Sequence, residues 1–299
     1  MLRKIFIALM IIAIVSAPAY IIEEDSESEN PLEVVEVPEV KETPLFEDVP
    51  AKVAKYLNDD TEYSVYLAYP AQSSKAFIYA SKKMRSASMI KVFIMAAVME
   101  KVKQGEISLD EILTMEYYNM VGGAGIIAGY GAGATFKLRD VLEHMIIYSD
   151  NTATNMIIDR IGGEEINAYM TRNGYNDSFL GRKMMYHTAI AGNGENYSSV
   201  RDLGLFFTRL YKHECVGEQY DKIMIEILLK QTDIDCFPAA FPGKKVAHKT
   251  GALDDVYDDG GIIYSKNGDA VLVIMTEKLA SGEYETIRHM KAFARSVIK

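Results

Sequence analysis

Apolar and polar residues follow two different periods along this chain, and the two periods predict where strands and helices lie. Residues 62–69 and 76–80 are rich in β-branched and aromatic side chains, which is typical of strands. The same pattern returns near the C-terminus in three further segments: 245–251, 261–264 and 270–276. Between them, apolar residues recur every three or four positions, as they do on the buried face of a helix.

The helical period predicts elements at both ends and in the middle of the chain. A first helix is expected over 49–56, and an amphipathic helix closes the chain over 284–299. The expected helices between them are a run that begins at Ser88 and the segments 136–147, 152–161, 164–174 and 198–230. The order of these elements predicts an α/β (α+β) fold. It has one antiparallel five-stranded-type sheet, flanked by the terminal helices, with a mainly helical lobe inserted over about 83–245.

The first 48 residues follow neither period. Residues 1–19 combine two basic residues with an uncharged apolar run and a small-x-small site, which is the pattern of an export signal. An uncleaved membrane anchor is the alternative, because residues 5–22 approach the length that spans a bilayer. Residues 20–48 hold eleven acidic residues and one lysine, which predicts a disordered, solvated linker. We therefore expect a secreted or cell-envelope protein whose folded domain is 49–299.

Charge and composition exclude several classes of protein. The net charge of −10 belongs to the acidic linker, so the folded domain is nearly neutral and has no basic field to attract nucleic acid. Cys215 and Cys236 are too few for a disulfide-dense scaffold and do not resemble a metal-ligand cluster. They pair in an oxidising compartment or stay as two buried thiols. The glycine-rich residues 121–135 lack the ending of a phosphate-binding loop, so we expect a flexible loop at the edge of a cleft.

A serine stands three residues before a lysine where the longest apolar helical run begins. On a helix, Ser88 and Lys91 would share one face. A serine hydroxyl is a weak nucleophile that needs a base within hydrogen-bond reach, and a buried lysine at a helix N-terminus loses its proton more easily. The alternative is that Ser88 caps the helix. Spacing alone is not specific, because Ser296 and Lys299 repeat it.

Two further motifs follow in order along the chain. Ser149-Asp150-Asn151 lies on the expected link between two helices, and Lys249-Thr250-Gly251 lies on an expected strand. Together with Ser88-x-x-Lys91, they resemble the signature set of class A β-lactamases and penicillin-binding proteins. The resemblance covers most of residues 55–299. It implies a β-lactamase/transpeptidase-like fold and a monomeric serine hydrolase of small-molecule substrates, without cofactor or metal.

The resemblance also implies a role for each motif residue. Ser88 would be the acylated nucleophile, and Lys91 would be its base or the lysine that passes on its proton. Ser149 would relay a proton to the leaving nitrogen, beside the charge of Lys249. The backbone N–H groups of Ser88 and Ala252 would form the oxyanion hole. The other assignments are Asn151 at the substrate amide, Thr250 and Gly251 at the substrate carboxylate, Tyr117 or Tyr118 at the cleft rim, and Asp150 as a brace of the helix link.

Two residues that the class A pattern leads us to expect, a glutamate and an arginine, are absent from this sequence. Class A enzymes place a deacylating glutamate shortly after an arginine, but here Arg182 is followed by Met184, whose thioether cannot take a proton. His187 is the nearby group that can act as a base near neutral pH. Gly260 stands where a carboxylate-binding arginine is expected. Three acidic residues of this region lie away from the expected place: Glu164, Glu165 and Glu195.

These motifs support acylation and leave deacylation unexplained, so three functions stay open. The first is an exported β-lactamase that opens β-lactam rings through an acyl-serine and confers antibiotic resistance. The second is a D-alanyl-D-alanine peptidase, or another cell-wall acyl-serine hydrolase with slow deacylation, which the missing glutamate favours. The third is a non-catalytic sensor that binds penicillin or peptidoglycan. The complete set Ser88, Lys91, Ser149 and Lys249 argues against a pure binding protein.

Overall fold

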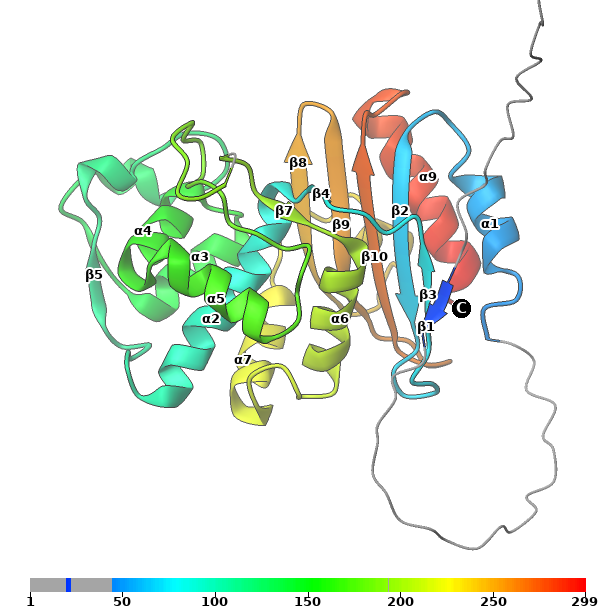
Figure 1. Ribbon diagram of the computed structural model, residues 1–299, viewed down its shortest axis with the longest axis horizontal. Helices are drawn as coiled ribbons and strands as arrows, with labels where there is room; N and C mark the ends of the chain where they lie inside the picture. The colour runs from blue at the N-terminus through cyan, green and yellow to red at the C-terminus, as the bar shows by residue number, and fades with distance from the viewer. Residues whose placement is uncertain (1–19, 23–44, 193) are drawn as a thin grey trace, which may run out of the picture.

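One antiparallel sheet of six strands carries the fold, in the order β1-β3-β2-β10-β9-β8. The computed structural model describes residues 20–22, 45–192 and 194–299 (Figure 1). The strands of the sheet are β1 (Tyr20–Ile22), β2 (Glu62–Ala68), β3 (Ala76–Tyr79), β8 (Val246–Leu253), β9 (Val256–Ile263) and β10 (Ala270–Glu277). Strand β8, which carries the lysine–threonine–glycine motif, lies at one edge.

Strand β1 corrects two expectations from the sequence. The sheet has six strands rather than five, and Tyr20–Ile22 forms a strand inside the segment that we expected to be a disordered linker. Its backbone pairs with residues 76–78 of β3, which would otherwise be the edge of the sheet. A tyrosine followed by two isoleucines has high β-propensity, and an edge strand offers unpaired N–H and C=O groups. The predicted signal and the rest of the predicted linker up to residue 44 lie outside the described residues.

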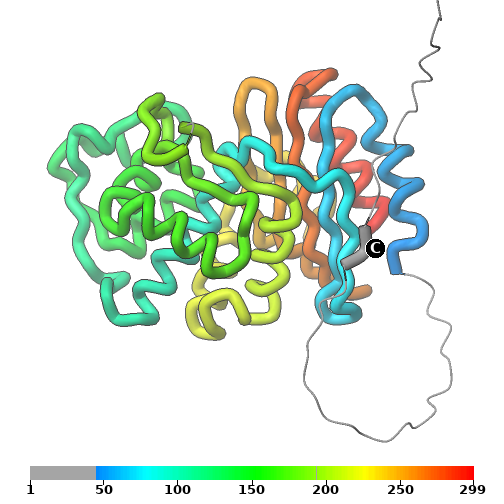
Figure 2. Tube along the Cα trace, in the orientation of Figure 1, coloured from blue at the N-terminus to red at the C-terminus, as the bar shows by residue number. Residues whose placement is uncertain are grey.

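Helices cover both faces of the sheet (Figure 1). On one face lie α1 (Val49–Tyr56) and α9 (Gly282–Val297), whose apolar residues share a core with β2 and β10. The C-terminal end of the chain therefore lies beside the N-terminal elements of the domain (Figure 2). There the Tyr69 hydroxyl donates to the carbonyl of Val297 at 2.5 Å. On the other face, α6 (Val200–Tyr211) packs against β2, β9 and β10. None of the described helices is long and apolar enough to cross a bilayer.

The inserted lobe between β3 and β8 is mainly helical. At its centre, α2 (Lys91–Gln104) is buried from Lys91 to Met99, and it ends at Gly105 in a left-handed conformation. The other helices are α3 (Leu138–Ile147), α4 (Asn151–Ile161), α5 (Gly163–Arg172), α7 (Glu218–Leu228) and α8 (Phe237–Ala240). Short 3-10 helices are η1 (Ala87–Ile90), η2 (Tyr117–Asn119) and η3 (Ile127–Tyr130).

Two small ladders change the predicted limits of the helices. Strand β5 (Ile112–Thr114) pairs with β6 (Thr135–Lys137), so the helix expected from residue 136 begins at Leu138. Strand β4 (Met84–Arg85) pairs with β7 (Tyr197–Ser198) just before the nucleophile segment. Ser88 itself lies on η1 and not on the first turn of α2. These differences arise because pairing between distant segments decides the local backbone, which a helical period cannot show.

Gly204 allows α6 to lie directly against β2. A Cβ atom at this position would lie 2.2 Å from Cγ of Tyr66, and the Tyr66 hydroxyl is within 3.0 Å of Thr208 Oγ1 on the same helix. We expect Gly204→Ala to lower the free energy of unfolding by about 1–3 kcal/mol through overpacking. Urea unfolding measures this change, with Gly129→Ala as the control because a Cβ atom there meets no neighbour. Equal effects of the two substitutions would contradict the expectation.

Candidate active site

The three motifs meet where the lobe joins the edge of the sheet. Ser88 lies on η1, Lys91 begins α2, Ser149 lies on the link between α3 and α4, and Lys249 lies on β8. The close approach of η1 to β8 favours a glycine at position 251. A Cβ atom there would lie 3.1 Å from the carbonyl oxygen of Ser86 and 3.1 Å from Cγ of Met89.

The amine of Lys91 is the centre of the site. Its Nζ lies 3.0 Å from Ser88 Oγ, 2.6 Å from the carbonyl oxygen of Ser149, 3.1 Å from Ser149 Oγ and 2.9 Å from Asn151 Oδ1. All four partners are neutral oxygen atoms. An ammonium group has three protons, so it cannot donate to all four at once. A neutral amine has a free lone pair, and the Ser88 hydroxyl can then donate to Nζ.

Burial favours the neutral form of Lys91. The side chain is fully buried, and this desolvation lowers the pKa of Lys91 well below its ordinary value. The nearby charge of Lys249 lowers that pKa further, whereas Asp150 raises it. A lysine in this environment can accept a proton from a neighbouring hydroxyl group.

Ser149 connects the two buried lysines. Its Oγ lies 3.1 Å from Lys91 Nζ and 3.1 Å from Lys249 Nζ. The residue has a left-handed backbone with a φ of 52°, which is uncommon outside glycine. Burial lowers the pKa of Lys249 to about 8, and its Nζ also donates to the carbonyl of Thr250 at 2.6 Å. The contacts thus form a continuous path for protons from Ser88 through Lys91 to Ser149.

Asp150 and Asn151 attach the glycine-rich loop to the site. Asp150 caps α4 by accepting from the N–H of Ala153 at 2.9 Å. Its other oxygen accepts from the N–H groups of Ile126 at 2.6 Å and Ile127 at 2.9 Å. Asn151 donates through Nδ2 to the carbonyl of Gly122 at 3.1 Å. Asp150 therefore lies in a position to brace the link, and the loop of residues 121–135 borders the site.

The loop around Met184 is held by Asn155 of α4. The Met184 N–H donates to Asn155 Oδ1 at 2.9 Å, and Asn155 Nδ2 donates to the Met184 carbonyl at 3.2 Å. The Met184 side chain is buried. Beside it, Met185 is exposed in a left-handed conformation, and its sulfur lies near Gly123 and Asn151. A methionine therefore stands at the position where a carboxylate was expected, and the neighbouring methionine lies beside the glycine-rich loop.

The other acid–base candidates of this region are placed as follows. His187 is exposed on the Met184 loop. Glu195 forms an ion pair with Arg182, with 3.1 Å between the closest nitrogen and oxygen atoms. Glu165 pairs with Arg172 on α5 at 3.0 Å, and Glu164 is exposed at the start of the same helix.

The structure also places the remaining predicted site residues. Gly260 lies opposite Lys249 in the β8–β9 register, and a Cβ atom there would lie 2.9 Å from Cε of Met89, so a larger residue would require the Met89 side chain to shift. Thr250 is buried and Ala252 is exposed further along β8. Tyr117 and Tyr118 are 81% and 57% exposed.

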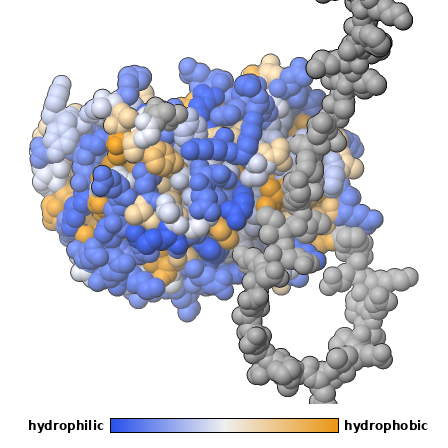
Figure 3. Space-filling model, viewed as in Figure 1, coloured by the Kyte–Doolittle hydropathy of each residue, from blue (hydrophilic) through white to orange (hydrophobic). Residues whose placement is uncertain are grey.

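Large apolar side chains are exposed at several points of the lobe. In the space-filling view, hydrophobic patches lie scattered among hydrophilic surface over this part of the molecule (Figure 3). The exposed side chains of the lobe include Ile112, Tyr117, Tyr118, Ile126, Tyr130, Tyr148 and Met185. Within the described residues, no cluster of histidine, cysteine and carboxylate side chains could hold a metal ion.

Sequence reasoning missed two residues of this site, Asn155 and Met185. Asn155 follows Asn151 by four positions on α4, so the two share one face of the helix. That spacing is a signal that could have identified Asn155. Met185 gave no such signal, because its position beside Asn151 depends on the path of the loop.

Comparison with known proteins concerns the family and the fold. The family model for the β-lactamase enzyme family matches residues 46–299. The chain is 28% identical over 236 residues to β-lactamase SME-1 of Serratia marcescens, which covers 76% of this chain and 80% of that protein. The solved β-lactamase of Sphaerobacter thermophilus is 26% identical, with a TM-score of 0.77, and the match covers 84% of this chain and 95% of that one.

A further solved structure is that of a single-residue variant of PBP-A as an acyl-enzyme complex with penicillin G. It is 25% identical to this chain, with a TM-score of 0.71, and the match covers 84% of this chain and 95% of that one. These structural matches confirm the fold that the order of strands and helices predicts.

The two buried lysines are expected to titrate as a coupled pair. Lys249 should lose its proton near pH 8, and its charge lowers the pKa of Lys91. Removing that charge in Lys249→Gln should therefore raise the pKa of Lys91. Carbon-13 NMR of protein labelled at the lysine Cε atoms follows both groups. The exposed control Lys82→Gln should leave the pKa of Lys91 unchanged, and an unchanged value in Lys249→Gln would disprove the coupling.

Proposed function

The chain belongs to the β-lactamase enzyme family, and from this we propose that it is an exported acyl-serine hydrolase that opens β-lactam rings through an ester on Ser88. The observation that carries the proposal is the distance of 3.0 Å between Ser88 Oγ and the buried amine of Lys91. The amine has no carboxylate among its four hydrogen-bond partners and can therefore serve as the base for Ser88.

Acylation follows from the proposed roles of these side chains. Ser88 Oγ attacks the lactam carbonyl carbon while its proton passes to Lys91 Nζ. The backbone N–H groups of Ser88 and Ala252 stabilise the oxyanion, which is worth roughly 3–4 kcal/mol for each donor in comparable sites. As the bond between the carbonyl carbon and the lactam nitrogen breaks, Ser149 passes its proton to that nitrogen and receives in its place the proton that Lys91 took from Ser88. Lys249, while charged, and Thr250 bind the substrate carboxylate.

Two relatives support this proposal through their described properties. SME-1 is named a β-lactamase, and the PBP-A variant is described as an acyl-enzyme complex with penicillin G. Neither is more than 28% identical to this chain, so the choice of substrate rests on the site itself. Export rests on the signal pattern of residues 1–19. We further propose that the protein acts as a monomer on small molecules.

A second candidate is a D-alanyl-D-alanine peptidase or a related cell-wall hydrolase, and Met184 favours it. Deacylation needs a base that activates water, and a thioether cannot take a proton. The buried Met184 stands where class A enzymes carry that base. A β-lactam would then be released slowly and would act as a trap, whereas peptidoglycan stem peptides would be the natural substrate.

Intact-mass measurement over time after mixing with benzylpenicillin tests the proposal. We expect wild-type protein to gain the mass of one penicillin molecule and Ser88→Ala to gain none, because the ester forms on the Ser88 hydroxyl. Ser296→Ala is the matched control, since Ser296 also precedes a lysine by three residues and should not affect labelling. Wild-type protein that shows neither adduct nor turnover would refute the proposal. Rapid return of free enzyme would favour β-lactamase over peptidase.

Introducing a carboxylate at position 184 should speed release of the acyl group. The hydrogen bonds of Asn155 hold the backbone of Met184 and use no atom of its side chain, so they can persist when that side chain is replaced. We expect Met184→Glu to raise the deacylation rate by about 10²–10⁴-fold, the range of general-base catalysis. Met184→Gln is the control of equal size without a base. The decay of the penicillin adduct measures both rates, and equal rates in the two variants would refute this role.

A further inference from the structure

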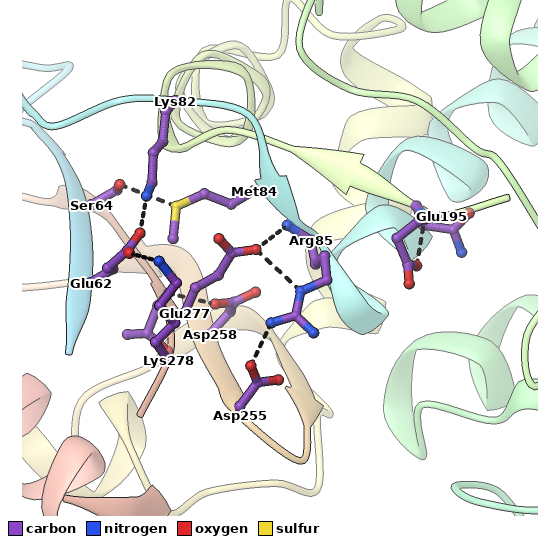
Figure 4. Close-up of polar contacts among 12 residues, drawn as sticks. Glu62, Ser64, Lys82, Met84, Arg85, Glu195, Asp255, Asp258, Glu277 and Lys278 are labelled. Atoms are coloured by element: carbon purple, nitrogen blue, oxygen red, sulfur yellow. Dashed lines mark hydrogen bonds and ion pairs between the residues drawn. The ribbon is translucent and has the colours of Figure 1, made fainter. Parts of the chain in front are cut away.

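Arg85 precedes the nucleophile segment and bonds to the end of β10. Its backbone N–H donates to Glu277 Oε1 at 2.9 Å, and its side-chain Nε donates to the same oxygen at 3.2 Å. Glu277 is the last residue of β10, and Figure 4 shows both contacts. The start of the nucleophile segment is thus fixed to the central part of the sheet.

The same guanidinium group also reaches the turn between β8 and β9. Arg85 Nη2 donates to Asp255 Oδ2 at 2.8 Å (Figure 4). Asp255 follows Ala252 by three residues, so this contact holds the end of the strand that carries the second proposed oxyanion donor. A planar guanidinium can bind two carboxylates in fixed directions, which a lysine amine cannot do.

A second contact lies on the other side of Ala252. At Gly251, β8 packs against the Ser86 carbonyl and Ala87, where a Cβ atom would lie within 3.2 Å of both. The distance between the N–H groups of Ser88 and Ala252 is therefore held by two contacts. One is the packing at Gly251, and the other is the ion pair between Arg85 and Asp255.

Arg85 brings positive charge to a corner of the molecule that holds three carboxyl groups. Asp255, Asp258 and Glu277 lie around the guanidinium (Figure 4). Asp258 is fully buried opposite Gly251 in the β8–β9 register, and one of its oxygens has no hydrogen-bond partner. Burial raises the pKa of Asp258 well above its ordinary value, and the charge of Arg85 opposes this shift. Loss of that charge would leave the turn beside uncompensated carboxyl groups.

We propose that Arg85 is a positioning residue: by bridging Asp255 and Glu277, it sets the separation of the Ser88 and Ala252 N–H groups that form the oxyanion hole. The inference rests on the acylation of Ser88 proposed above. Arg85 and Asp255 are 30% and 48% exposed, and ion pairs this open to solvent contribute little to overall stability. Their effect is therefore expected in the rate of acylation more than in folding.

Lys82 provides a matched control for Arg85. It lies three residues earlier on the same segment and forms an ion pair with Glu62, as Figure 4 shows. Glu62 belongs to β2 and pairs also with Lys278. Substitution of Lys82 therefore removes a positive charge from the same neighbourhood as substitution of Arg85 does. The ion pair that it breaks lies on β2 rather than on the β8–β9 turn.

The test compares Arg85→Ala, Arg85→Lys, Asp255→Ala and Lys82→Ala in the full chain. Benzylpenicillin acylation is timed by intact mass, and infrared difference spectroscopy records the carbonyl stretch of the acyl ester. We expect Arg85→Ala and Asp255→Ala to slow acylation about tenfold or more, since misplaced catalytic groups cost rate steeply. Their carbonyl band should move to higher wavenumber, because the oxyanion-hole hydrogen bonds weaken. Arg85→Lys should restore part of both properties, and Lys82→Ala should match wild type.

The outcomes separate this inference from the proposed function. Wild-type protein that is never acylated would refute the proposed function itself. Wild-type acylation together with unchanged rates and carbonyl bands in Arg85→Ala and Asp255→Ala would refute the role of Arg85. Slower acylation that Lys82→Ala shares, with an unchanged carbonyl band, would also overturn it, because that pattern indicates a general loss of stability. Circular dichroism establishes that each variant is folded.

Discussion

The surrounding structure is arranged around one energetically costly feature, the burial of the Lys91 amine. An ammonium group taken out of water without a carboxylate partner costs several kcal/mol, so the group becomes neutral instead. The apolar α2 keeps the amine dry, and the left-handed backbone of Ser149 turns two oxygen atoms towards it. Lys249, held against the same Ser149 hydroxyl, adds a repulsive charge. One unfavourable burial thus turns an ordinary lysine into a base.

Much of this arrangement follows from the sequence, because its signals are local. The apolar run of 270–276 and the motif residues were recognised without knowledge of distant segments. The features that escaped prediction all depend on long-range contacts. Strand β1 forms by pairing with β3. Ser88 lies in a 3-10 helix, η1, which packs on β8. The site residues were predicted as a set, but the placement of Ser149 Oγ between two amines comes from the meeting of three segments.

Membership of the family does not by itself establish which reaction this protein catalyses. The fold and the family are those of β-lactamases, yet the two halves of hydrolysis rest on different parts of the chain. The groups for acylation lie on η1, α2, the α3–α4 link and β8, which are buried elements that restrain one another. The group for deacylation would come from a loop. Loops tolerate change more readily than packed elements, so the proposed acylation site is restrained by packing, whereas the group proposed for acyl release is not.

The pair of hydrogen bonds between Asn155 and the backbone of Met184 has an evolutionary consequence. Because these bonds use main-chain atoms of residue 184, any side chain at that position leaves their donor and acceptor in place. Selection can then alter the chemistry of that position without first rebuilding the loop. The methionine codon, however, differs from both glutamate codons by more than one nucleotide. A lineage that carries this methionine would have to pass through an intermediate residue before it gained a carboxylate here.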